Sequence, residues 1–270
     1  MVAAKSLQIE QRTLQTPKNR RALRGFSNLL GKEYGSWWNT RRWLVHLLFW
    51  PLLLNGLVLV TAFSLAKEPN FTAFEIAQMV TTLFFLSLGQ AGAFGAVVAT
   101  QSAITGEKQR GTAAWIMSKP VPRDVFVLAK LVAQAVSFLS LAVVLPSAIF
   151  FGQSRILWGD APHPVLFVAS VLVVLLHVLF YLALTLMLGT FFRGSGPVAG
   201  IGASVLLGGL MVQERLSLLA PAMPWELPDI AALTAAEAPL VRVGMPIVAT
   251  VFWTVLFVVV ALWRFRRDEF

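Results

Sequence analysis

Cysteine is absent from this chain of 270 residues, and charged residues make up only 13% of it. Without cysteine the chain can form no disulfide, no thiolate metal site and no cysteine nucleophile. An average soluble domain carries about 25% charged residues. Because residues of the set AVILMFWYC reach 57%, too few charges remain to give such a chain a water-exposed surface. The composition therefore predicts an integral membrane protein.

The sequence also lacks the short motifs of common nucleotide-hydrolysing and hydrolytic enzymes. The phosphate-binding pattern G-x-x-x-x-G-K-[ST] fails because Gly31-Lys32 is followed by Glu33. Neither H-E-x-x-H nor G-x-S-x-G occurs, and the three histidines are far apart in sequence. We therefore expect no catalytic, cofactor-binding or metal-binding residues in this chain.

Long apolar segments are what the sequence does contain. Six of them are long enough to cross a hydrocarbon core of roughly 30 Å. They span residues 43–66, 75–103, 124–151, 164–192, 195–213 and 243–263. We therefore predict an all-α integral membrane protein with six transmembrane helices over residues 43–263. Acidic and basic residues are absent from the middles of these segments, which argues against a carrier coupled to protons or sodium through buried charges.

The placement of the basic residues predicts the orientation. With the N-terminus in the cytoplasm, 18 of the 22 Lys and Arg residues fall on the cytoplasmic side and four on the outer side. The positive-inside rule therefore predicts that both ends of the chain lie in the cytoplasm. Membrane topology then explains the net charge of +9, and we expect the basic residues to meet lipid and not nucleic acid.

The segments outside the spans differ in character. We expect residues 1–22, which are polar and basic, to form a flexible cytoplasmic tail, and residues 264–270 a cytoplasmic C-terminus. In residues 23–42 apolar side chains recur at steps of three and four with basic ones between them. This pattern predicts an amphipathic helix in the headgroup plane, with an irregular anchor as the alternative.

The external segment 214–242 is too apolar for a solvated linker and is interrupted by Pro221, Pro224 and Pro228. Proline in a helix interior removes a hydrogen bond and breaks the helix. We therefore expect short helices that lie on or dip into the outer leaflet, with an irregular outer cap as the alternative.

Two sets of residues within the spans are candidates for helix packing or for a transport path. Small residues stand at four-residue spacing in the fifth span, at Gly196, Gly200, Ser204 and Gly208. Such a stripe lets helix backbones approach closely, and it serves equally well inside one bundle or between two subunits. Polar residues of the first two spans, Asn55, Gln78, Thr82 and Gln90, either line a polar path or make interhelical hydrogen bonds.

Residues 104–123 form the most substantial loop on the predicted cytoplasmic side. Ala113 to Ser118 favour a short helix, which Lys119-Pro120-Val121-Pro122 ends because proline cannot continue it. An apolar patch on the water side of a membrane indicates a partner. Trp115 is the aromatic anchor that such a patch needs, unless it only anchors the loop among lipid headgroups.

This loop resembles the hallmark segment of the type-2 ABC permease family. The family carries a Glu, then Gly-Thr, a short helix, a Pro and an Arg, and a Lys in the next span. The matching positions are Glu107, Gly111, Thr112, Pro120, Arg123 and Lys130. The resemblance extends to the basic helix that contains Lys32-Glu33, to the six-span layout and to the structured loop before the last span. Pro122 departs from it, because a polar residue is common before the Arg.

The resemblance implies a permease subunit of an ABC exporter in the cell (inner) membrane of a bacterium or archaeon. Such subunits work as a homodimer or with a paralogue, on two cytoplasmic ATPase subunits that bind ATP and magnesium. The loop helix would be the coupling helix, and the residues that dock on the ATPase would be Glu107, Gly111, Thr112, Trp115, Pro120 and Arg123. Alternatively, Glu107 holds the loop through Arg110 or Arg123. The competing function is a self-sufficient secondary carrier or channel, and the substrate is not indicated by any residue.

Overall fold

The computed structural model describes residues 18–118, 122–158, 162–215, 222–239 and 243–268, and this part of the chain is helical without strands. The helices are α2 (Lys18–Trp38), α3 (Arg42–Leu65), α4 (Ala73–Thr100), α5 (Thr105–Gln109), α6 (Thr112–Met117), α7 (Arg123–Leu139), the π-helix η1 (Ser140–Val144), α8 (Leu145–Trp158), α9 (Pro164–Phe191), α10 (Ser195–Arg215), the 3-10 helix η3 (Pro224–Glu226), α11 (Leu227–Ala235) and α12 (Gly244–Arg266). The prediction of an all-α integral membrane protein is confirmed. Most of the predicted N-terminal tail lies outside the described residues.

Five helical stretches of the described residues are long and apolar enough to cross a membrane. They are Arg42–Leu65, Ala73–Gln109, Arg123–Trp158, Pro164–Phe191 and Gly244–Arg266. The predicted span 195–213 falls on α10, whose apolar stretch Ser195–Gly209 is shorter than these five. Six spans therefore stay a prediction, with five supported by length and composition.

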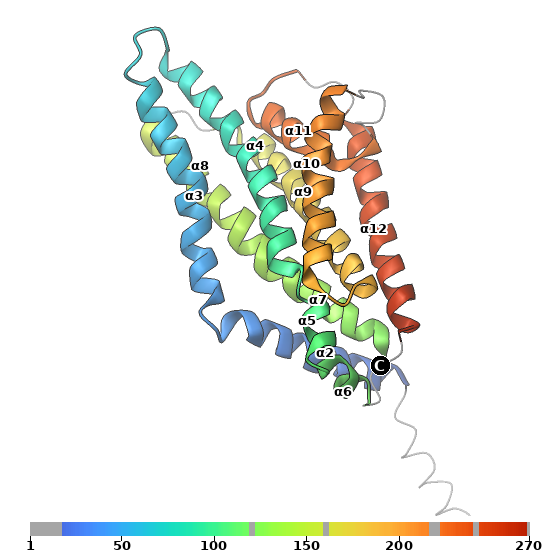
Figure 1. The fold of residues 1–270 in the computed structure, drawn as a ribbon. Helices are drawn as coiled ribbons and strands as arrows, with labels where there is room; N and C mark the ends of the chain where they lie inside the picture. The colour runs from blue at the N-terminus through green and yellow to red at the C-terminus, as the bar shows by residue number, and fades with distance from the viewer. Residues whose placement is uncertain (1–17, 119–121, 159–161, 216–221, 240–242, 269–270) are drawn as a thin grey trace, which may run out of the picture.

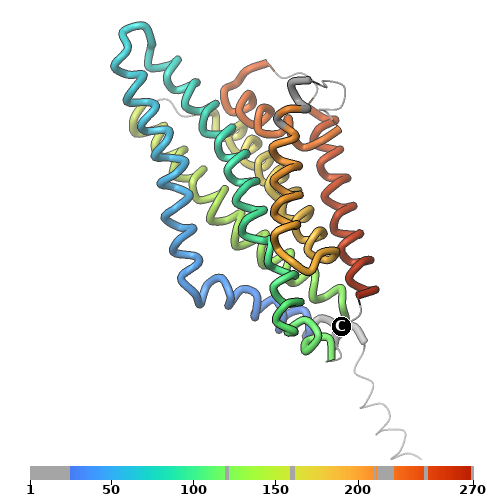
Figure 2. The backbone as a smooth tube through the Cα atoms, viewed as in Figure 1, coloured from blue at the N-terminus to red at the C-terminus, as the bar shows by residue number. Residues whose placement is uncertain are grey.

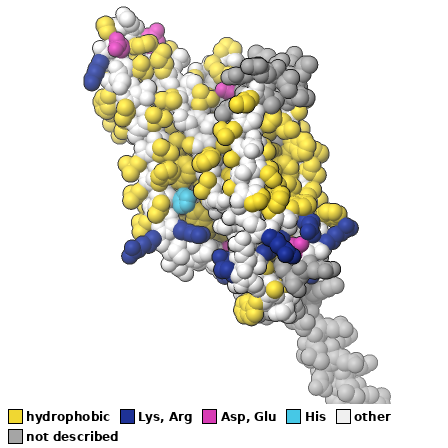
Figure 3. Space-filling model, viewed as in Figure 1, with side chains coloured by type: hydrophobic (Ala, Val, Ile, Leu, Met, Phe, Trp, Pro, Cys, Tyr) yellow, Lys and Arg dark blue, Asp and Glu magenta, His cyan; other side chains and the backbone are white. Residues whose placement is uncertain are grey.

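The helices form an elongated bundle around α9 (Figures 1 and 2). Helix α9 packs against α12, α4 and α11, and most of its side chains in the second half are buried. At one end of the bundle α2 lies across the other helices, beside α5, α6 and the end of α12 (Figure 1). Lys and Arg side chains gather along this edge, below a largely hydrophobic surface (Figure 3). We call this end of the bundle, which contains α2, α5, α6 and the last turn of α12, the basic end.

The amphipathic segment is one helix that turns into the first span. Helix α2 starts at Lys18 and ends at Trp38, so it begins and ends earlier than the expected 23–42. A bend at residues 39–41 follows, in which the Thr40 hydroxyl donates to the Ser36 carbonyl and accepts from the Arg42 amide. This bend lets α2 run across the bundle end while α3 runs along it (Figure 1).

The third predicted span, 124–151, is three helical pieces that run from Arg123 to Trp158. A π-helical turn over Ser140–Val144 joins α7 to α8. Pro146 follows this turn and offers no N–H to the carbonyl of Ala142, with which its ring would also clash in a regular α-helix. A widened turn relieves that clash, so the chain continues past the proline as one spanning stretch.

At the other end of the bundle, the segment that was predicted to be external packs against the long helices. Helix α11 packs against α9 and α4. A Cβ on Gly89 of α4 would lie 2.8 Å from Pro228, so only glycine allows this approach. His177, fully buried on α9, makes a 3.0 Å hydrogen bond with the Pro224 carbonyl. The segment therefore contains short helices, as expected, and its residues 216–221 and 240–242 lie outside the described residues.

Candidate functional site

The predicted coupling loop is two short helices at the basic end. Helix α5 ends at Gln109 and α6 covers Thr112–Met117, close to the predicted helix 113–118. Gly111 between them has φ 69°, a left-handed conformation that glycine adopts without steric cost. That turn lets α6 leave the axis of α5, and the predicted breaker Pro120 lies outside the described residues.

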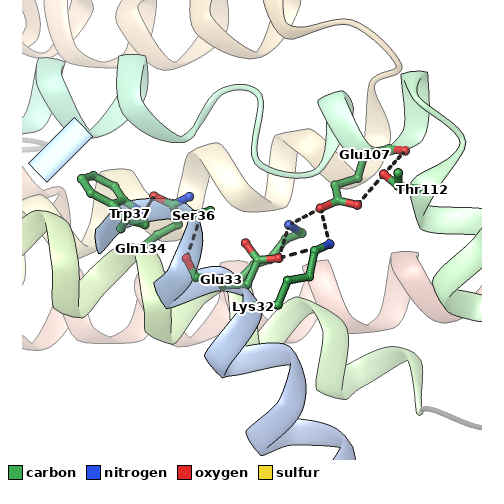
Figure 4. Close-up of polar contacts among 8 residues, drawn as sticks. Lys32, Glu33, Ser36, Trp37, Glu107, Thr112 and Gln134 are labelled. Atoms are coloured by element: carbon green, nitrogen blue, oxygen red, sulfur yellow. Dashed lines mark hydrogen bonds and ion pairs between the residues drawn. The ribbon is translucent and has the colours of Figure 1, made fainter. Parts of the chain in front are cut away.

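Glu107 of α5 lies at the centre of a buried ion network (Figure 4). Its carboxylate accepts hydrogen bonds from Lys130 at 3.1 Å, Lys32 at 3.0 Å and the Thr112 hydroxyl at 2.5 Å. Lys130 also donates to Glu33 at 2.8 Å. The side chain of Lys130 is only 3% exposed, and those of Glu33 and Glu107 are 8% exposed. Two buried carboxylates thus share one buried ammonium, and the half-exposed Lys32 balances the remaining charge.

This network fixes α2 to α7. Glu33 and Trp37 lie one turn apart on α2, and they meet Lys130 and Gln134, one turn apart on α7. The Trp37 indole N–H donates to the Gln134 side-chain oxygen at 3.1 Å, inside the protein. Because Lys130 also holds Glu107, the helices α2, α5 and α7 meet at one ammonium group.

Residues at the end of α12 contact α5 and α7 on the side away from the ion network. Lys108 of α5 forms a 2.6 Å ion pair with Asp268 and donates to the Thr190 carbonyl. Arg123 donates to the carbonyls of Arg266 and Asp268, both at 2.6 Å. These bonds tie Arg123 to the end of α12, and its docking to a partner stays a prediction. Glu107 was expected to be held by Arg110 or Arg123, if not by a partner, and it is held by Lys130, Lys32 and Thr112.

Helix α6 has one buried and one exposed face. Ala113 and Ile116 are buried, and Ile116 packs in a small cluster with Ile104, Phe126 and other apolar residues of the basic end. Trp115 is 63% exposed, one of the most exposed large apolar side chains described. The buried face therefore seats α6 on the ion-paired segment and directs Trp115 away from the bundle.

Gly196 and Gly200 of the small-residue stripe on α10 face away from the bundle, whereas Ser204 and Gly208 line an apolar cavity with residues of α9 and α12. A Cβ built on Gly196, Gly200 or Gly208 would meet no atom within 4 Å, and Ser204 is exposed. Glycines on another face of the same helix do pack inward, with a Cβ on Gly202 only 2.8 Å from Val97. Gly196 and Gly200 thus lie on one open surface of α10, and the packing role of the whole stripe stays a prediction.

The four candidate residues of a polar path are not gathered at one place. Asn55 is buried, and in the described structure its amide finds no hydrogen-bond partner; the same holds for the side-chain oxygen of Gln90. Because Trp50 of α3 packs against Gly95 of antiparallel α4, Asn55 and Gln90 lie at about the same depth. Thr82 is half-buried and Gln78 is exposed, and Gln78 lies some 18 Å along α4 from Gln90 at 1.5 Å per residue.

Comparison with known families identifies this bundle. The chain matches the model of the ABC-2 family transporter proteins over residues 52–270. The chain belongs to the ABC-2 transporter family. It is therefore a multi-pass membrane protein and a permease component of an ABC transporter. A search among curated proteins returned no match.

Sequence reasoning missed several residues of this ABC-2 site. Lys32, Glu33 and Lys130 were noted for the family resemblance, but their pairing with Glu107 was not expected, and neither was the bond between Trp37 and Gln134. A signal existed, because Glu33 and Trp37, like Lys130 and Gln134, stand four residues apart and share a helix face. A lysine inside an apolar helix also needs a carboxylate partner. Which carboxylate it finds depends on the tertiary fold.

Proposed function

We propose that this ABC-2 protein is the membrane subunit of an exporter driven by a separate cytoplasmic ATPase, and that α6 is its coupling helix. The observation that carries the proposal is an exposed tryptophan on a short helix seated on a buried ion network. Exposed aromatic side chains over a rigid base are typical of interface hot spots. The ATP and magnesium would be bound by the ATPase, because the phosphate-binding motif is missing from this chain.

The contacts suggest how a displacement of α6 reaches the spanning helices. A push on α6 moves α5, whose Glu107 is tied to Lys130 of α7 and through it to Glu33 of α2. On the other side Lys108 of α5 is tied to Asp268 at the end of α12. Buried ion pairs are costly to break, so these helices would move together when ATP binding closes the ATPase.

The experiment separates docking from transmission. With the ATPase co-expressed, Trp115→Ala should lose co-purification of the ATPase, whereas Glu107→Gln should retain the ATPase but lose transport-linked hydrolysis. Trp38→Ala is the matched control, since Trp38 is also an exposed tryptophan of the basic end, at 43%. If Trp115→Ala and Trp38→Ala lowered co-purification of the ATPase equally, Trp115 would only anchor the loop among lipid headgroups. Full association and coupling in both the Trp115 and Glu107 variants would overturn the coupling role.

We also propose that two permease subunits associate through the outward face of α10. The support is the open space above the exposed Gly196 and Gly200, which another helix backbone can approach closely. Gly200→Leu should lower the dimer fraction in crosslinking while leaving the monomer's thermal stability unchanged. Gly152→Leu on α8, where a Cβ also meets no atom within 4 Å, is the control. If both or neither of the variants lose the dimer, another face is used.

The proposed orientation places the basic end in the cytoplasm, with the cell or inner membrane around the bundle. Because the chain has no cysteine, single cysteines report sidedness without background. Ser118→Cys, after α6, should react with a membrane-impermeant maleimide only in inverted vesicles. Glu237→Cys, exposed after α11, should react only in right-side-out cells, and the reverse labelling would refute the orientation.

A further inference from the structure

Two cavities meet between α2, α3 and α4 near the basic end. One has a volume of about 330 Å³ and polar walls from α2, the end of α4, α5 and α7. The other is an apolar groove of about 300 Å³ between α3 and α4, lined by residues such as Val45, Phe49 and Phe94. Ala99 lines both, and Arg42 of the polar cavity stands one turn before His46 of the groove. Both volumes are within the range of ligand sites.

The polar cavity carries a surplus of positive charge. Its walls contain four basic residues and two acidic ones. Lys32, Lys130, Glu33 and Glu107 neutralise one another in the ion network. Among the described residues Arg42 and Arg110 form no ion pair, and Ser102 also lines the cavity. These two guanidinium groups are donors suited to a phosphate.

The apolar groove leads from this cavity into the part of the bundle that lipid surrounds. Val45, Phe49 and Phe94, between 50% and 63% exposed, form its outer edges, while the Trp50 side chain is buried at its base. The groove thus has room and apolar contact for a hydrocarbon chain, and the polar cavity lies where that chain's headgroup would be. Basic pockets between spanning helices at the cytoplasmic side are suited to anionic lipid headgroups.

We propose that this paired cavity binds one anionic phospholipid of the leaflet at the basic end. Arg42 and Arg110 hold the phosphate, and an acyl chain lies in the groove between α3 and α4. The charge argues against the α10 helix of a second copy as the occupant. That helix would bring Arg193, just before its first residue, toward a cavity that is already positive. A bound lipid would brace α2 against α3 and α4 beside the ion network.

The test measures binding of phosphatidylglycerol to the full chain in detergent, titrated and followed by native mass spectrometry. The unmodified chain should bind one phosphatidylglycerol in preference to phosphatidylcholine. Each arginine removed should weaken binding about fivefold, so that Arg42→Gln with Arg110→Gln weakens it about 25-fold. The control pair Arg41→Gln with Arg193→Gln removes the same charge from the basic end at residues that do not line the described cavity, and it should leave binding unchanged.

Further arms distinguish the lipid from other occupants. Ala99→Phe, which fills the junction of the two cavities, should also weaken binding, and inorganic phosphate at equal concentration should not displace the lipid. Equal loss in both arginine pairs would show general surface attraction and overturn the site. Displacement by inorganic phosphate, or full binding to the Ala99 variant, would overturn the role of the groove. Binding that appears only when Gly200→Leu prevents dimers would show that a second copy covers the groove, which also overturns the proposal.

Discussion

The two ends of this bundle are closed by different kinds of contact. At the basic end charged side chains hold the elements together, with Lys130 between Glu33 and Glu107 and Lys108 on Asp268. At the opposite end α11 and η3 are held by close approach to glycines, with Pro228 against Gly89 and Trp225 against Gly209. Neutral hydrogen bonds add to these contacts: His177 bonds the Pro224 carbonyl, and the indoles of Trp225 and Trp253 donate to the carbonyls of Val205 and Ala222.

The difference bears on how each end can move. The energy of van der Waals contacts between small and bulky residues changes gradually as helices slide, since each atomic contact contributes little energy. A buried ion pair resists separation because a charge left alone in the interior costs several kcal/mol. We therefore expect the basic end to move as one body when a partner pushes α6, and the opposite end to be where helices slide relative to one another.

The largest expected effect is at Lys130. Lys130→Met keeps the volume of the side chain but leaves the Glu33 and Glu107 carboxylates buried without their shared cation. The free energy of unfolding should fall by about 3–5 kcal/mol, measured by SDS titration in mixed micelles. Lys32→Met is the control, and because Lys32 is half-exposed its loss should cost about 1 kcal/mol or less.

A second arm of this experiment tests the charge itself. Combining Lys130→Met with Glu33→Gln and Glu107→Gln removes the buried charges together, and most of the lost stability should return, since neutral replacement of a buried ion network is often tolerated. No recovery in the triple variant would show that the packing of Lys130, and not its charge, holds the basic end. Equal losses for Lys32→Met and Lys130→Met would contradict the distinction between buried and exposed charge.

At the opposite end the next largest effect is expected at Gly209. A Cβ on Gly209 would overlap the Trp225 indole, whereas a Cβ on its neighbour Gly208 meets no atom within 4 Å. Gly209→Ala should therefore lower the free energy of unfolding by about 1–3 kcal/mol through overpacking. Gly208→Ala should raise it by up to about 1 kcal/mol, because alanine favours helix. Effects of the same sign would show that α10 is not oriented as described.

Much of the fold follows from the sequence because the bilayer imposes simple rules. Helix length, apolar composition and the placement of Lys and Arg predicted the spanning segments and their shared basic end. The sequence predicted a short helix over residues 113–118, ended by the prolines that follow, and in the structure α6 covers Thr112–Met117. The start of α2 was not predicted, because tertiary packing helps to decide where a helix begins. The π-helical turn before Pro146 was not predicted either, because it depends on how the chain accommodates the proline ring.

The site was only partly predictable because its contacts join residues distant in sequence. The family resemblance pointed to Glu107, but its partner Lys130 lies 23 residues away and Lys32 lies 75 away. The resemblance also pointed to Arg123, but its bonds to carbonyls at the end of α12 were not predicted. The orientation of the α10 stripe was undecided in the sequence, since periodicity shows which residues share a helix face but not what packs against that face.

A smaller loss of stability is expected when the neutral hydrogen bond between Trp37 and Gln134 is removed from the basic end. Trp37→Phe keeps the ring near His46, whose centroid lies 5.1 Å away, but removes the N–H that Gln134 accepts. An unsatisfied buried acceptor costs about 1–3 kcal/mol, so a loss at the lower end of this range is expected in the same SDS titration. Adding Gln134→Leu should restore part of it, and a larger loss in the double variant would mean that Gln134 has another partner.

The smallest expected effect is at the exposed ion pair of the same end. Arg266 binds both carboxylate oxygens of Asp124, at 2.6 and 2.5 Å, but its side chain is 63% exposed. Water screens such pairs, so good geometry alone adds little stability. Asp124→Asn should shift the midpoint of thermal unfolding by no more than about 2 °C, and Asp124→Ala should do the same apart from a weaker first turn of α7. If the thermal midpoints of Asp124→Asn and Lys130→Met fell equally, the contacts at the end of α12, and not burial, would give the basic end its rigidity.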